Sequence, residues 1–121
     1  MGGLRQSSKV NSNLGQLHII TGKITYASGV PSLIGCNDPT ATVADTATGD
    51  ATVTYEAFLA APAAVASPYI LTSDVHWNIQ VEQATTTTFE VKFIDDDNTA
   101  AIADPADGDG CTFIIIGMRN N

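Results

Sequence analysis

The sequence predicts an all-β protein built as a single β-sandwich, jelly-roll-like or Greek key in topology. Several short segments alternate apolar and polar residues with a period of two, which places every second side chain inward. Threonine, a residue that favours strands, occurs 15 times. No segment combines an i, i+3, i+4 apolar pattern with helix caps, so helix content should be small.

The chain of 121 residues fits one domain. Hydrophobic residues make up 44% of it, but 16 of them are alanines. We therefore expect a thin core, because the larger apolar side chains are few.

The charge balance excludes several classes of partner. Thirteen acidic residues against five basic ones give a net charge of −8, which disfavours binding to nucleic acid and to anionic membranes. No apolar run approaches the roughly 20 residues that cross a bilayer, and the first residues lack the apolar core of a secretory signal. We expect a soluble protein.

Residues 1–15 are predicted to form an extended N-terminal arm, and residues 16–121 the sandwich. The arm is rich in Gly, Ser and Asn, and it carries positive charge, whereas residues from Asp38 onward are strongly acidic. We expect this arm to anchor the acidic body to an acidic groove of a larger assembly or an adjacent subunit. The predicted contacts are Leu4, Arg5, Lys9, Val10 and Leu14.

Strands are expected wherever alternation or β-branched runs lie between turn residues. The predicted strands are 17–26, 51–59, 69–72, 76–83, 86–94 and 111–118, with a weaker one in 40–48. In 86–94, Phe89, Val91 and Phe93 should point inward. Residues 27–31 are predicted as a turn around Ser28-Gly29. Residues 60–67 are predicted as a connection with room for one helical turn, because prolines interrupt this alanine-rich stretch.

The segment 111–118 is apolar on both faces. It should therefore be a central strand covered on both sides, or a strand whose outer face meets another subunit. Together with the thin core, this pattern predicts a homo-oligomer, most simply a trimer.

The acidic segment 95–110 could wrap a calcium ion, but it lacks the distal Glu of an EF-hand and any Gly-Asp repeat. A solvated loop is the favoured interpretation, and no metal or other cofactor is predicted. Trp77 could stack on a sugar ring, although a lone tryptophan more often fills the core. The candidate contacts for a glycan or an ion are Trp77, Asp104, Asp107 and Asp109.

No catalytic residues are predicted. His18 and His76 have no second ligand at metal-binding spacing, and no Ser lies in a nucleophile elbow. The three glutamates occupy outward strand positions, where solvation is expected. Cys36 and Cys111 are predicted to be independent thiols, with a disulfide between them as the alternative.

The order of these elements resembles small β-sandwich virion proteins of tailed bacteriophages. The resembling segments are the strand at 19–24, Ser28-Gly29, the glycine-led strand 49–58, Pro62, the strand 89–93 and the closing run 109–117. The resemblance implies a capsid cement or decoration protein that is made in the host cytoplasm, forms a trimer and binds the major capsid protein or another virion protein. The alternative is a receptor- or glycan-binding module of a fibre or spike, and a hydrolase ranks third.

Overall fold

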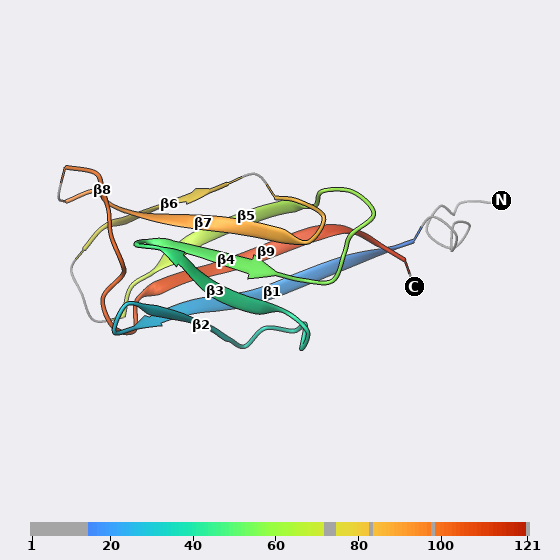
Figure 1. The fold of residues 1–121 in the computed structure, drawn as a ribbon, viewed down its shortest axis with the longest axis horizontal. Helices are drawn as coiled ribbons and strands as arrows, with labels where there is room; N and C mark the ends of the chain where they lie inside the picture. Colours follow the sequence, from blue (N-terminus) through green and yellow to red (C-terminus); the bar gives the residue numbers. More distant parts are fainter. Residues whose placement is uncertain (1–14, 72–74, 83, 98, 121) are drawn as a thin grey trace.

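The computed structural model describes residues 15–71, 75–82, 84–97 and 99–120. Within these ranges, nine strands form two antiparallel sheets. The strands are β1 (Gln16–Ala27), β2 (Val30–Ile34), β3 (Thr42–Ala47), β4 (Asp50–Thr54), β5 (Ala63–Tyr69), β6 (Trp77–Val81), β7 (Thr88–Asp95), β8 (Ala101–Ile102) and β9 (Gly110–Arg119). They run nearly parallel to the long axis of the molecule (Figure 1).

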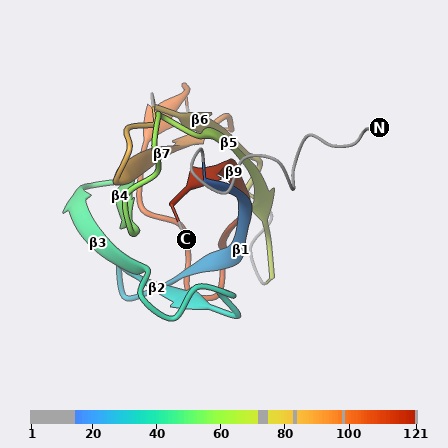
Figure 2. The same ribbon diagram turned by 90° about the vertical axis from the view of Figure 1, so that its right-hand side faces the viewer.

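The two sheets face each other as the layers of a sandwich. Sheet A has the order β2-β1-β9-β5, and sheet B has the order β3-β4-β7-β6, with β8 paired to β7. Figure 2 shows β1, β9 and β5 on one side of the molecule and β3, β4 and β7 on the other. The predicted all-β sandwich is therefore confirmed, whereas its jelly-roll or Greek-key topology stays a prediction. The arm contacts Leu4, Arg5, Lys9, Val10 and Leu14 lie outside the described residues.

The core lies between the sheets and is built from the inward rows of their central strands. In β7, Phe89, Val91 and Phe93 are buried, as the alternation predicts. Phe89 packs against Phe113 of β9 with ring centroids 5.3 Å apart, so aromatic contacts cross from one sheet to the other.

The Ser28-Gly29 turn between β1 and β2 is confirmed. Ser28 has a φ of 53° and Gly29 a φ of 76°, the left-handed pair that a tight hairpin turn needs. The hairpin continues into β2. The sequence analysis had predicted no strand at these residues.

The connection predicted for 60–67 was wrong from residue 63 onward, and of the described residues in the strand predicted at 69–72 only Tyr69 is in a strand. Residues 63–69 form β5, which pairs with β9 along its whole length from Ala63↔Ile116 to Tyr69↔Gly110. An edge strand tolerates Pro68 because one side of its backbone has no ladder partner. The strand predicted for 51–59 also ends early, at Thr54, and Phe58 rather than Ala57 turns into the core.

Candidate functional site

The outward side of sheet A carries a continuous apolar surface. The register places Leu17 beside Met118, Ile19 beside Ile116, and Val65 beside Ile114. All of these side chains are between 41% and 62% exposed. We call Leu17, Ile19, Val65, Ile114, Ile116 and Met118 the apolar face.

Strand β9 is apolar on both faces and central in its sheet, as predicted. Its inward residues Cys111, Phe113 and Ile115 are buried in the sandwich, while Ile114 and Ile116 point outward. In a single copy, therefore, one face of this strand is covered by sheet B and the other is in water. That another subunit covers the outer face remains a prediction.

The apolar face is also poor in charge. Among the described outward-facing residues of β1, β9 and β5, Lys23 is the charged one. Its Nζ lies 3.9 Å from the centre of the Tyr69 ring, which is a cation–π contact. Both residues lie beyond Ile114 toward the opposite end of the sheet from Leu17 and Met118.

The outward side of sheet B is polar and carries a charged cluster of Asp50, Glu82, Glu90 and Lys92. Lys92 Nζ lies 3.6 Å from Asp50 Oδ2 and 3.9 Å from Glu82 Oε1. Burial and the neighbouring carboxylate of Asp50 raise the pKa of Glu90. One lysine thus faces three carboxyl groups, which leaves the cluster net negative.

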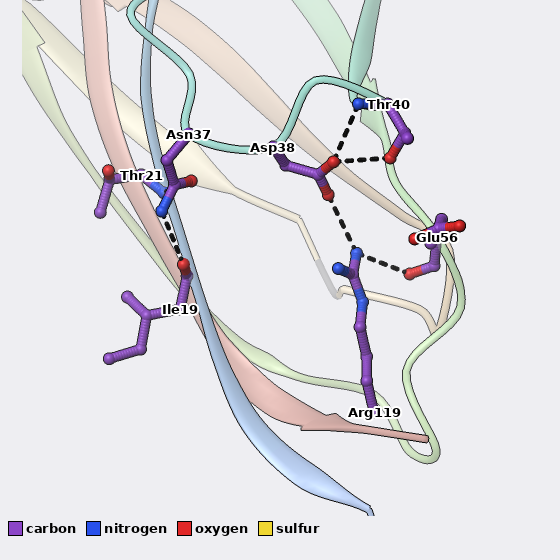
Figure 3. A network of polar contacts seen from close by, with 7 residues as sticks. All are labelled: Ile19, Thr21, Asn37, Asp38, Thr40, Glu56 and Arg119. Carbon is purple, nitrogen blue, oxygen red and sulfur yellow. Dashed lines mark hydrogen bonds and ion pairs between the residues drawn. The ribbon is translucent and has the colours of Figure 1, made fainter. Parts of the chain in front are cut away.

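A buried ion pair joins the end of β9 to the loop before β3 (Figure 3). Arg119 Nη2 donates to Asp38 Oδ2 at 3.1 Å and to the Glu56 carbonyl oxygen at 3.0 Å. The Arg119 guanidinium also covers the Phe58 ring, with its Cζ 4.6 Å from the ring centre. The positive charge of Arg119 is therefore neutralised by contacts within the protein.

The Asp38 carboxylate is further held by Thr40, whose backbone N–H and Oγ1 donate to its Oδ1 at 2.9 Å and 2.6 Å. Burial alone would raise the pKa of Asp38. The hydrogen bonds from Thr40, together with the hydrogen bond and the positive charge of Arg119, outweigh the effect of burial and lower the pKa of Asp38. Asp38 is therefore a permanently charged partner for Arg119 at neutral pH.

Asn37 closes part of the free edge of β1. Its Nδ2 donates to the Ile19 carbonyl oxygen at 2.9 Å (Figure 3), and its Oδ1 accepts from the Thr21 N–H at 3.0 Å. Strand β2 pairs with β1 only from Lys23 onward, so these bonds satisfy an edge that β2 does not reach. A hollow of about 290 Å³ beside them is lined in part by His18, Asn37 and Arg119.

The structure places Trp77 in the core. It is 7% exposed, and its ring meets Phe93 edge-on with centroids 6.3 Å apart. This burial agrees with the core position that the sequence favoured for a lone tryptophan. It argues against Trp77 as a glycan contact, because sugar stacking needs an open ring face.

Asp104, Asp107 and Asp109 each accept a backbone hydrogen bond from a different segment. The donors are the N–H groups of Gly49, Ser28 and Leu71, at 2.7, 2.7 and 2.8 Å. Asp109 is fully buried, so the expected solvated loop is wrong at this residue. In the described ranges, no three His, Cys, Asp or Glu side chains are grouped so that they could hold a metal ion.

The remaining candidate residues are the two histidines and the two cysteines. His76 is exposed, with its Nδ1 3.1 Å from Asp97 Oδ1, and His18 lies in β1. Cys36 and Cys111 are free thiols, as predicted, and burial raises the pKa of Cys111 to about 12. Cys111 therefore stays protonated and is a poor nucleophile at neutral pH.

Comparison of the chain with protein-family models, with curated proteins and with solved structures finds no match. The part of the chain that the structure describes contains no helix long and apolar enough to cross a bilayer. The contrast between the two outer faces of the protein is therefore the feature of its structure that bears most directly on its function.

Proposed function

We propose that this chain is a structural protein that acts by binding, without turnover, as a subunit of a larger protein assembly. Following the resemblance of its strand order, the assembly is a phage particle, and the chain is a cement or decoration protein that stabilises the shell. The partners in this proposal are copies of the same chain and the major capsid protein.

The apolar face is the observation that carries the proposal. Large aliphatic side chains on a solvated sheet face add little to the stability of a single sandwich, and antiparallel sheets usually present polar residues there. Proteins that assemble use such surfaces, because removing apolar area from water stabilises the bound state. The burial of Trp77 gives the alternative, glycan-binding function no aromatic platform at that residue.

Immunogold labelling of intact particles from the source culture tests this function. An antibody raised against the purified chain should label the shell in a regular array. Labelling confined to tail fibres or spikes would favour the receptor-binding alternative. Protein found only in the particle-free fraction would contradict both.

A deletion of residues 2–14 tests whether the predicted arm, and not the sandwich, binds the particle. The shortened chain should remain folded by circular dichroism but no longer bind particles that lack the protein. Unchanged occupancy and salt sensitivity would show that docking uses the sandwich instead of the arm contacts Arg5 and Lys9.

A further inference from the structure

The outward side of sheet A is large enough to bind another protein. The apolar face exposes on the order of 500 Å², which is in the upper part of the range of about 300–600 Å² for the largest apolar patch on a monomer, and such patches are often functional. Thr21, Ser67 and Thr112 adjoin the face on the same side of the sheet, and Ile34 and Val30 of β2 lie farther out, beyond Lys23. Together they approach the roughly 800 Å² per partner that stable interfaces bury.

Charge indicates what covers this surface. The chain carries a net charge of −8, and two copies that approach through the charged cluster or the acidic turns repel each other. The apolar face has no acidic residue among its members, so it is where like-charged copies can meet at the lowest electrostatic cost. A basic partner protein would instead be drawn to the acidic surfaces.

The edges of sheet A are less suited to contact with another copy than its outer face is. Asn37 occupies the backbone groups of Ile19 and Thr21 at the β1 edge, and Pro68 lies in the β5 edge strand. A shallow hollow of about 160 Å³ between Val65 and Ile114 opens on the outer side of sheet A. An aliphatic side chain of a facing copy fits such a hollow, and the same residues serve both partners in a symmetric contact.

We infer that the apolar face is the self-association surface of this protein, and that its occupant is the same face of a second copy. Such a symmetric contact joins copies in pairs and replaces the trimer that the sequence led us to expect. This inference deepens the proposed function and rests on its self-assembly part. The side chains that leave water and contact the second copy are those of Leu17, Ile19, Val65, Ile114, Ile116 and Met118.

Sedimentation equilibrium of the full chain with Ile116→Lys tests the inference. The variant has a net charge of −7 in place of −8, so general repulsion between copies decreases. It should nevertheless raise the dissociation constant at least about 100-fold, because its ammonium group would be buried without a partner. The matched control is Thr54→Lys, which makes the same charge change at an exposed position on the outer side of sheet B. It should leave the dissociation constant unchanged.

Val65→Thr provides a milder variant that keeps the β-branched shape and the strand preference. It should weaken association about tenfold, because a hydroxyl replaces a methyl group on each copy. Circular dichroism should show the wild-type fold in every variant. If Ile116→Lys does not fold, Val65→Thr against Thr54→Lys decides the question.

Several results would overturn the inference. One such result is a wild-type chain that stays monomeric up to about millimolar concentration, because even weak complexes form at that concentration. The apolar face would then be covered by residues 1–14 or by a different protein. Association that survives both face variants, or that Thr54→Lys weakens equally, would place the interface elsewhere. Self-association that is lost as expected, in a protein that labels no particles, would leave this inference standing and contradict only the proposed function.

Discussion

Sheets A and B enclose the same core, but their outer faces differ in chemistry. On sheet A, β9 presents Ile114 and Ile116 to water, and on sheet B, the neighbouring strands present Thr52, Glu90 and Lys92. Both sheets keep the same inward alternation of apolar residues, so folding alone requires no such difference. The inward rows therefore serve stability, whereas the outward rows distinguish a face suited to contact from a face suited to solvent.

The largest expected effect separates the two rows of β9. Ile115→Ala should lower the free energy of unfolding by about 3–4 kcal/mol, because it opens a cavity at a fully buried position. Ile114→Ala, at a position 42% exposed, should cost less than about 1 kcal/mol. Urea unfolding at protein concentrations low enough to exclude association measures both. Equal losses would mean that the outer row stabilises the fold of the single copy as well.

Breaking the ion pair on the inward side of sheet A should have the next largest effect. Arg119→Met should cost about 3 kcal/mol at neutral pH, because it leaves the Asp38 carboxylate, 9% exposed, without its cation. Urea unfolding measures this loss, and Lys23→Met, an exposed-side cation change on the same sheet, is the control. A loss no larger than that of the control would show that the Arg119 pair is energetically equivalent to a surface contact.

The same ion pair gives a pH dependence with a defined sign. The pKa of Asp38 is lowered in the folded protein, so its stabilisation is complete above the ordinary value of 3.8 and is lost as pH falls through the folded pKa. Stability measured against pH should therefore fall less steeply in acid for Asp38→Asn than for wild type. Parallel curves would show that other carboxyl groups cause the acid loss.

Removing the lysine of the charged cluster should have a smaller effect. Lys92→Met should cost about 1 kcal/mol at neutral pH, because three carboxyl groups lose their partly exposed cation. The loss should shrink in acid as those groups take up protons. Thermal unfolding at both pH values measures it, and a loss that does not change with pH would indicate that Lys92 acts through the packing of its aliphatic chain.

The smallest effect is expected from Glu90→Gln, which should stabilise the protein by less than about 1 kcal/mol at neutral pH. The folded-state pKa of Glu90 is raised above 4.5, so its contribution is most favourable below that value and declines as pH rises through the folded pKa. A neutral amide removes this penalty. Glu56→Gln, at an exposed carboxyl, should leave the melting temperature unchanged, and a stabilisation equal to that of Glu90→Gln would attribute the gain to net charge alone.

The apolar face was only partly predictable. The double apolarity of 111–118 indicated that β9 would present isoleucines on both sides, and Leu17 and Ile19 lay in a predicted strand. Val65 was missed, because alanines and prolines around it resemble a connection. That β1 and β5 both pair with β9, and so join these side chains into one surface, is not contained in any local pattern.

Local sequence patterns were enough to predict the all-β class, the inward row of β7 and the acidic character of the protein, because alternation and charge are local and additive properties. Tertiary structure alone decided that Arg119 meets Asp38, 81 residues earlier in the chain, that Asp109 is buried, and that 63–69 becomes an edge strand. These outcomes depend on which strands pair and which ends meet. Such long-range pairings lower the free energy of the chain only after the entropy cost of closing its loops has been met, so no short window of sequence specifies them.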